Sequence, residues 1–251
     1  MKPISLQLYS LREQAKDDFV GVLKAVADMG YVGVEPAGMQ GMSPADVRKV
    51  LDDLQLVCSS THGPFPSSET ISQRVDEAGA LGTDMIISGL GRKAFETPDA
   101  SKASVDKLAE AASLVVGAGM KFGYHNHWWE FDEVDGRTPY DLIMAEVPEM
   151  FSELDVYWAA NFGAVDVPAV VTKYASRIPL LHVKDGPLVR DEPHTAVGAG
   201  KMDIPAIIAA ADPDVLGWLI VELDDCGTDM AQAVRESCAY LVGEGLGRGS
   251  K

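Results

Sequence analysis

Residues 4–35 read ISLQLYSLREQAKDDFVGVLKAVADMGYVGVE, and this stretch carries the pattern that decides the fold. Two short apolar runs, at residues 4–9 and 32–35, predict β-strands. Between them, residues 19–29 carry apolar side chains with helical spacing at Val20, Leu23, Val26 and Ala27. A strand, a helix and a second strand in this order indicate a βα unit that feeds a parallel sheet.

The same alternation continues along the rest of the chain. Further apolar runs predict strands at residues 56–61, 85–88, 121–125, 154–158, 180–184 and 219–223. Helical patterns fill the gaps at residues 44–54, 70–81, 100–118, 140–147, 167–174, 204–210 and 230–243. Ser43 and Pro44 are a typical N-cap and first helical residue. Eight strands and eight helices in about 250 residues are what an α/β (β/α)₈ TIM barrel requires.

A doubly wound open sheet is the alternative architecture. It usually carries a glycine-rich phosphate-binding turn after its first strand, and here that turn is Ser10-Leu11-Arg12-Glu13. We therefore expect a single TIM-barrel domain over residues 1–244, followed by a disordered tail at residues 245–251.

The composition limits the classes of partner. A formal net charge of −17 disfavours binding to nucleic acid or to anionic membrane surfaces, and a neutral sugar fits it better than a multiply phosphorylated one. No signal peptide and no membrane-length apolar run are visible. The three scattered cysteines, Cys58, Cys226 and Cys238, argue against a disulfide framework. We expect a cytoplasmic protein; whether it assembles with copies of itself or with another chain stays open.

Polar side chains gather at the carboxyl ends of the predicted strands, the face that carries the active site of a TIM barrel. Strands six, seven and eight offer Asp155, His182 and Glu222. The runs around His182 and Glu222 should be buried, and a buried carboxylate needs a cation or several donors. A shared divalent ion would meet this need, because mixed carboxylate and imidazole ligands suit first-row divalent metals. The alternative is a structural cluster in which Asp155 caps a turn and Glu222 pairs with Lys184.

Side-chain alternation adds second candidates. Residues two apart on an extended strand face the same side, so His127, Lys184 and Asp224 should accompany His125, His182 and Glu222 toward the barrel mouth, and Tyr157 should accompany Asp155. Trp128 and Trp129 follow the strand-five histidines. One of them could stack on a sugar ring, or the pair could pack at the rim of the barrel.

Several motifs make the chain resemble a known family. They are YHNHWWEF at residues 124–131, LDVYW at 154–158, PLLHVKD at 179–185, VGAGKMDI at 197–204 and VE at 221–222. With them the chain resembles, over nearly its whole length, the xylose-isomerase-like TIM barrels that include sugar phosphate isomerases and epimerases, ketose 3-epimerases, inosose dehydratase and endonuclease IV.

The resemblance implies one metal bound by Glu, Asp, His and Glu from strands five to eight. Asp155, His182 and Glu222 match this set in type, whereas His125 stands where the first glutamate is expected. In the epimerases the two glutamates also exchange the proton, so His125 becomes a ligand or base here, with His127 or Glu130 as alternatives. The strand-two glutamate and strand-three histidine that contact substrate match Glu35 and His62.

The function expected from these residues is proton transfer next to the carbonyl of a ketose or keto-sugar. The metal, Mn²⁺ first and Co²⁺, Fe²⁺, Zn²⁺ or Mg²⁺ as alternatives, would act as a Lewis acid. Candidate catalytic residues are Glu222, His125, His127 and Lys184, and candidate substrate contacts are Tyr9, Glu35, His62, Trp128 and Glu130. Two alternatives stay open: a lyase or dehydratase that eliminates a β-substituent, and a non-catalytic sugar-binding or partner subunit.

Overall fold

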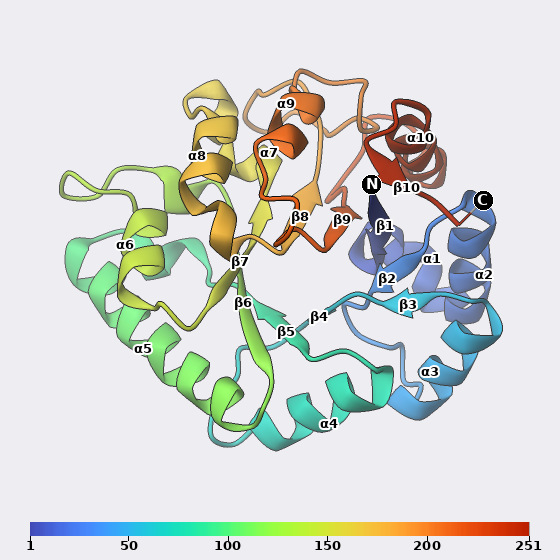
Figure 1. Cartoon of the computed structure of the whole chain (residues 1–251), viewed down its shortest axis with the longest axis horizontal. Coiled ribbons are helices and arrows are strands. Elements are labelled where there is room, and N and C mark those ends of the chain that lie inside the picture. Colours follow the sequence, from blue (N-terminus) through green and yellow to red (C-terminus); the bar gives the residue numbers. More distant parts are fainter. Residues whose placement is uncertain (251) are drawn as a thin grey trace.

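The computed structural model describes residues 1–250 and shows a ring of parallel strands surrounded by helices (Figure 1). The strands follow one another around the ring in the order β3–β2–β1–β9–β8–β7–β6–β5–β4. Their bounds are β1 Lys2–Gln7, β2 Gly33–Glu35, β3 Val57–Cys58, β4 Thr61–His62, β5 Met85–Ser88, β6 Lys121–His125, β7 Phe151–Asp155, β8 Leu180–Val183 and β9 Trp218–Val221. The (β/α)₈ barrel predicted from the sequence is confirmed.

The ring closes through a third strand that is bent. The sequence predicts one strand at residues 56–61, but β3 pairs only with β2 and β4 pairs only with β5. Ser59 and Ser60 lie between the two pieces, and both are buried. The Ser59 hydroxyl donates to the Val34 carbonyl at 3.2 Å and lies 2.8 Å from the Ser5 hydroxyl. These side-chain bonds satisfy polar groups where the strand ladder is interrupted.

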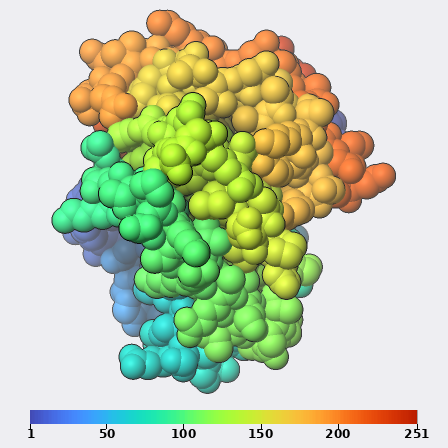
Figure 2. All heavy atoms as spheres, turned by 90° about the vertical axis from the view of Figure 1, so that its left-hand side faces the viewer, coloured from blue at the N-terminus to red at the C-terminus, as the bar shows by residue number. Residues whose placement is uncertain are grey.

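The helices cover the outside of the ring. They are α1 Arg12–Asp17, α2 Phe19–Met29, α3 Pro44–Asp53, α4 Ile71–Leu81, α5 Pro98–Gly117, α6 Pro139–Glu146, α7 Val156–Ala159, α8 Val167–Tyr174, α9 Ile204–Ala209 and α10 Met230–Gly243. Figure 2 shows α5, α6 and α8, coloured green to gold, covering one flank. Proline in the first turn begins α3, α5, α6, α8 and α9, where its missing N–H costs nothing.

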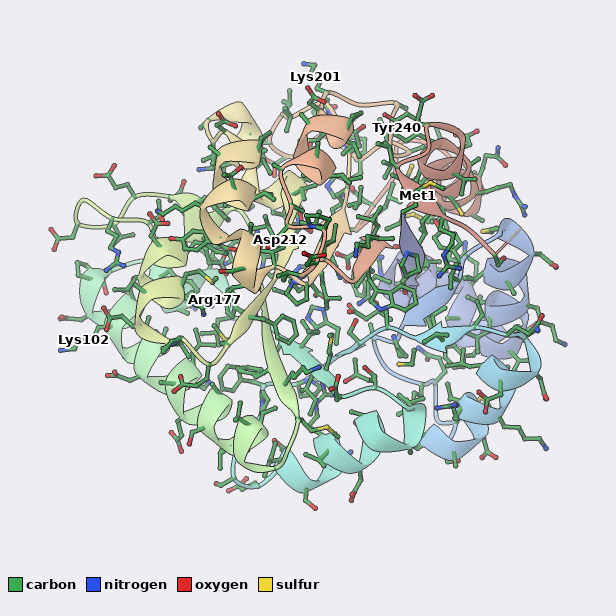
Figure 3. The ribbon with its side chains drawn as sticks, in the orientation of Figure 1. Met1, Lys102, Arg177, Lys201, Asp212 and Tyr240 are labelled. Atoms are coloured by element: carbon green, nitrogen blue, oxygen red, sulfur yellow. The ribbon has the colours of Figure 1, made fainter. Side chains whose placement is uncertain are left out.

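Two kinds of side chain fill the protein interior. Apolar residues pack between strands and helices, as on α5, where Val105 and Leu108 face inward while Lys102 points to solvent (Figure 3). Inside the ring, Leu180 and Ile220 form an apolar floor together with Ile87. Two residues further along β8 and β9 the inward positions are His182 and Glu222. The alternation of a strand therefore places a polar layer directly above an apolar one.

The sequence-based strand at residues 154–158 is wrong over its second half. β7 ends at Asp155, whose carboxylate accepts a hydrogen bond from the Trp158 backbone N–H at 2.8 Å and caps α7. An aspartate at an N-cap ends the extended conformation, because the cap side chain satisfies a free N–H of the first helical turn. Tyr157 is therefore helical, and the same-face argument that joined it to Asp155 does not apply.

The chain end differs from the disorder expected for residues 245–251. Gly247–Arg248 form strand β10, which pairs in parallel with β1, and the Ser250 N–H donates to the Gly30 carbonyl at 2.8 Å. Leu246 packs against the main apolar core, which anchors this segment. Lys251 lies outside the described residues. Within residues 1–250, none of the helices combines the length and the apolar character needed to cross a membrane.

Candidate metal centre

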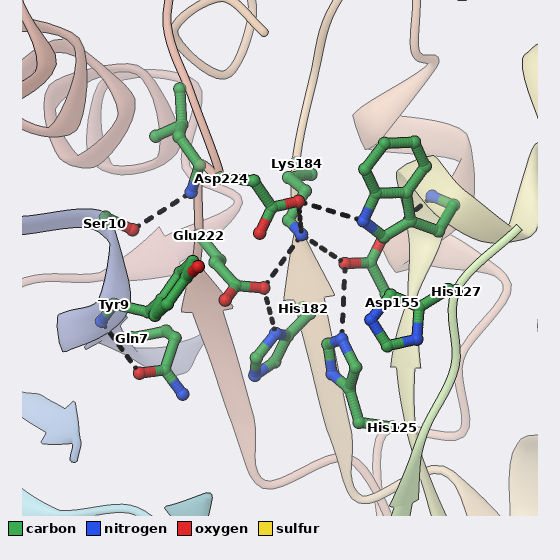
Figure 4. A network of polar contacts seen from close by, with 12 residues as sticks. Gln7, Tyr9, Ser10, His125, His127, Asp155, His182, Lys184, Glu222 and Asp224 are labelled. Atoms are coloured by element: carbon green, nitrogen blue, oxygen red, sulfur yellow. Dashed lines mark hydrogen bonds and ion pairs between the residues drawn. The ribbon is translucent and has the colours of Figure 1, made fainter. Parts of the chain in front are cut away.

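Four metal-ligand side chains meet at the carboxyl end of the barrel (Figure 4). His125 ends β6, Asp155 ends β7, His182 lies in β8 and Glu222 follows β9. All four are buried, and one ligand atom from each lies within 4.8 Å of the others. These are the four residues that the sequence nominates as metal ligands, and the fold brings them together from four consecutive strands.

The donor set fits a divalent ion. The Asp155 Oδ2 atom is buried, with Lys184 Nζ at 2.9 Å and His125 Nε2 at 4.0 Å. On the other side, His182 Nδ1 lies 3.0 Å from Glu222 Oε2. Two carboxylates and two imidazoles facing one point are ligands that first-row divalent metals accept. Buried carboxylates need positive charge nearby, and a divalent ion at the point shared by the four ligand atoms would supply it in addition to Lys184.

Lys184 contributes a positive charge to the same place. Its Nζ atom lies 2.9 Å from Asp155 Oδ2, 2.9 Å from Glu222 Oε2 and 2.8 Å from Asp224 Oδ2 (Figure 4). Burial disfavours the ammonium, but the three carboxylates outweigh it and hold the Lys184 pKa well above its ordinary value. The Glu222–Lys184 ion pair that the sequence left open therefore exists.

The pKa values of the two carboxylates shift in opposite directions. Burial raises the pKa of Asp155 to about 6, and Lys184 only partly opposes this. Burial also acts on Glu222, but Lys184 and His182 outweigh it and lower the Glu222 pKa well below its ordinary value. Glu222 is thus an ionised hydrogen-bond acceptor at neutral pH, which makes it a weak base unless its partners move.

The histidines at the end of β6 are electrically neutral at pH 7. Burial is the main cause that lowers the His125 pKa well below its ordinary value, and neighbouring His182 and His62 add to it. Burial and then Lys184 lower the His127 pKa to about 4. A neutral imidazole keeps a lone pair, so each ring can bind a metal or accept a proton.

A second polar layer lies one step deeper in the barrel. Glu35 accepts hydrogen bonds from Gln7 and Ser60 and lies 3.2 Å from His182 Nε2. Glu153 lies beside it, fully buried, with Oε2 3.1 Å from His182 Nε2. Burial and the charge of Glu35 raise the Glu153 pKa well above its ordinary value, whereas His182 outweighs burial and lowers the pKa of Glu35.

The sequence reasoning missed Glu153. Its predicted strand began at residue 154, one position too late, so Glu153 fell outside the strand. The signal was available, because Glu153 lies two residues before Asp155 and residues two apart on a strand share a face. A charged residue inside a buried strand is itself a reason to look for a partner.

A cavity of about 300 Å³ opens beside the four residues, and its lining comprises Gln7, Tyr9, Ala37, His62, His125, His127, Glu222 and Asp224. Asp155 and His182 are fully buried behind this lining. A larger cavity of about 620 Å³ adjoins it and shares Tyr9, Ala37 and His62. Both volumes lie within the range of small-molecule sites. Tyr9 and His62, nominated as substrate contacts, line both cavities.

Three other nominated substrate contacts lie elsewhere. Glu35 is fully buried beneath the cavity. Glu130 is also fully buried, with its carboxylate bonded to the Tyr124 hydroxyl at 2.6 Å and to the His127 backbone N–H at 2.9 Å. Trp128 lies at a separate cavity of about 210 Å³, with the Arg190 guanidinium 4.0 Å from its ring. It is Trp129 that stacks on His127, with 4.2 Å between ring centroids.

Two polar side chains position the site from outside it. The Asp155 backbone N–H donates to the Asn126 side-chain carbonyl at 3.0 Å, and the Asn126 side-chain N–H donates to the Asp155 backbone carbonyl at 3.1 Å. These two bonds hold the end of β7. Asp185 is fully buried and accepts four backbone N–H groups, which fixes the loop after β8. A Cβ at Gly200 would lie 2.0 Å from the Asp185 carboxylate, so only glycine fits there.

A comparison with family models gives a match over most of the chain, and it is consistent with the barrel and with the polar residues at the carboxyl ends of its strands. Residues 23–242 match the family model of the xylose isomerase-like TIM barrels. This chain belongs to that family. The resemblance inferred from the motifs is therefore confirmed.

Several solved structures are similar to this chain. A sugar phosphate isomerase/epimerase from Parabacteroides distasonis shares 27% identity, with a TM-score of 0.78 over 96% of this chain and 93% of the other. The probable 3-DHS dehydratase AsbF from Bacillus anthracis shares 15% identity, with a TM-score of 0.76 over 96% and 99%. The IOLI protein, solved with a zinc atom, shares 15% identity, with a TM-score of 0.73 over 97% of both chains. The last two share the fold alone. No curated protein matches the chain.

Proposed function

We propose that the protein is a metal-dependent isomerase or epimerase that moves a proton next to the carbonyl of a ketose or keto-sugar. The observation that carries this proposal is the convergence of His125, Asp155, His182 and Glu222 on one buried point beside a cavity of about 300 Å³. The similarity to a sugar phosphate isomerase/epimerase at 27% identity supports the substrate class.

These four side chains would hold the divalent ion, with Mn²⁺ as the first candidate and Co²⁺, Fe²⁺, Zn²⁺ or Mg²⁺ as alternatives. When bound there, the ion acts as a Lewis acid for neighbouring carbonyl and hydroxyl oxygens of the substrate. We assign to the Lys184 ammonium, which lies 2.9 Å from Asp155 and Glu222, the stabilisation of the negative charge that would develop on the substrate oxygen.

Proton transfer needs a base that reaches the substrate. His127 lines the cavity, and its pKa of about 4 keeps the ring neutral at pH 7. Glu222 lines the cavity too, but His182 and Lys184 bind its Oε2 atom. We assign proton transfer to His127: its neutral ring removes the proton, and the imidazolium that forms returns it to the neighbouring carbon of the substrate. Tyr9 and His62 line the same cavity and would contact the substrate there.

A lyase reaction on the same site is the second candidate. His125 replaces the glutamate that the family resemblance places on strand five, so a symmetrical pair of glutamates is missing. Abstraction by one imidazole, followed by loss of a β-substituent, needs no second base of equal strength. The same fold in the probable dehydratase from Bacillus anthracis is compatible with this outcome.

One experiment separates these outcomes. The protein is incubated with Mn²⁺ and a panel of ketoses and 3-keto-sugars in D₂O, and the products are analysed by mass spectrometry and NMR. The proposal predicts an isomer that carries one deuterium at the carbon next to the carbonyl, absent with His127→Phe. Loss of water or of an aglycone would indicate the lyase. No deuterium incorporation into any of these compounds would contradict both.

A further inference from the structure

We propose that Glu153 is a positioning residue that orients the imidazoles of His125 and His182 for metal binding, an inference that rests on the metal site of the proposed function. Glu153 belongs to β7 and lies two residues before Asp155, so both side chains point into the barrel. Its Cα is paired in register with that of His125 on the neighbouring strand β6.

One oxygen of Glu153 contacts both rings. Its Oε2 atom lies 3.1 Å from His125 Nδ1 and 3.1 Å from His182 Nε2. The side chain is fully buried, and its Oε1 atom has no hydrogen-bond partner. The Glu153 carboxylate thus lies between the two imidazoles.

The opposite nitrogen of each ring faces the candidate metal. His125 Nε2 points toward Asp155 Oδ2 at 4.0 Å, and His182 Nδ1 points toward Glu222 Oε2 at 3.0 Å. An imidazole binds a metal through an unprotonated nitrogen, so its proton must sit on the nitrogen behind. An acceptor behind the ring fixes both the tautomer and the ring orientation. Glu153 supplies that acceptor for His125 and, at 3.1 Å, lies behind His182 together with Glu35.

Glu35 does not replace this role. It lies 3.2 Å from His182 Nε2, but no hydrogen bond joins it to His125 within residues 1–250. His62 is the remaining titratable group near Glu153, with Nδ1 3.9 Å from Oε2. His125 therefore depends on Glu153 for its Nδ1 hydrogen bond. Loss of such a partner typically weakens metal binding about 10- to 100-fold.

The test compares three variants of the full-length protein by calorimetric titration with Mn²⁺ and Zn²⁺. Glu153→Leu removes the acceptor, whereas Glu153→Gln keeps one carbonyl oxygen behind the rings. Glu130→Leu is the matched control, because Glu130 is equally buried but contacts neither metal-facing imidazole. We expect the Kd to rise about 10- to 100-fold in Glu153→Leu. Glu153→Gln should recover part of this loss, and the Kd of Glu130→Leu should stay within about twofold of wild type.

An equal Kd in Glu153→Leu and wild type, or an equal loss in Glu130→Leu, would overturn the proposal. A second readout needs neither metal nor a variant of Glu153. Nitrogen-15 NMR of the metal-free wild-type protein should show His125 protonated on Nδ1, with the signal assigned through His125→Asn. Protonation on Nε2 would overturn the proposal even if Glu153→Leu failed to fold. Absence of metal binding by wild type would instead contradict the proposed function.

Discussion

Replacing Lys184 by methionine tests how the candidate metal centre is held together. Methionine has a similar length and no charge, so the change removes the ammonium with little loss of volume. Three carboxylates at 2.8–2.9 Å from Nζ then lose their cation. Asp155 is fully buried, so water does not replace the ammonium there.

The size of the effect follows from this burial. Removing one partner of a buried ion pair costs about 3–5 kcal/mol, because the other charge stays buried and unpaired. In a protein of this length, 1 kcal/mol corresponds to roughly 2–4 °C in Tm, so metal-free Lys184→Met should melt about 6–20 °C below wild type. A bound divalent ion would face Asp155 and Glu222 directly. Saturating Mn²⁺ should therefore reduce the loss in Lys184→Met substantially.

The assay is thermal unfolding of both proteins, with chelator and with saturating Mn²⁺. Lys173→Met is the control, because Lys173 pairs with Asp141 at 2.9 Å on the surface. An exposed pair contributes about 1 kcal/mol or less to stability. The Tm of Lys173→Met should therefore differ little from that of wild type, and by the same amount with and without metal. An equal loss of Tm in Lys184→Met with and without Mn²⁺ would refute the idea that Lys184 and the metal share carboxylates.

Three further predictions concern stability and reactivity. Asp185→Asn should lower the free energy of unfolding in urea by roughly 1–3 kcal/mol for each backbone N–H left without an acceptor, because the amide presents donors where the carboxylate accepts four. Unchanged stability would contradict the role of Asp185. Burial raises the Glu130 pKa to about 8, so its protonated form stabilises the fold below about pH 4.5, and this stability is lost as the pH rises toward 8. Relative to Glu130→Gln, the free energy of unfolding of wild type should therefore fall by about 1.4 kcal/mol per pH unit in this interval. Parallel pH profiles of the two proteins would exclude a raised Glu130 pKa. Burial raises the pKa of Cys58 to about 12 and of Cys238 to about 11, so maleimide should label only the half-buried Cys226 quickly. A thiol that still reacts quickly with maleimide in Cys226→Ser would contradict this assignment to Cys226.

The sequence predicts the barrel well because each strand combines an apolar floor with a polar end. β8 illustrates this, since Leu180 and His182 lie on the same face, and the predicted run at residues 180–184 differs from β8 by one residue. The helices at residues 19–29, 167–174 and 230–243 have the predicted bounds. Apolar spacing and capping residues encode these elements locally.

The errors arise where a side chain overrides the local pattern. Asp155 caps a helix, which ends β7 three residues early, and the hydroxyl groups of Ser59 and Ser60 interrupt the third strand. The contacts inside the site depend on how neighbouring strands are staggered. No spacing along the chain shows that Glu153 lies behind both His125 and His182, or that Lys184 contacts Asp224 as well as Asp155. Those relations appear only when the strands are paired.

Metal content is the most direct test of the proposed centre. The purified protein is loaded with Mn²⁺ or Zn²⁺, freed of excess metal and analysed by elemental mass spectrometry beside Asp155→Ala and Glu222→Ala. Asp225→Ala serves as the control, because Asp225 is exposed and lies outside the four-residue cluster. We predict one metal per chain in wild type and Asp225→Ala, and far less in Asp155→Ala and Glu222→Ala. Wild-type protein without bound metal, or equal metal content in all four proteins, would contradict a metal centre built from these residues.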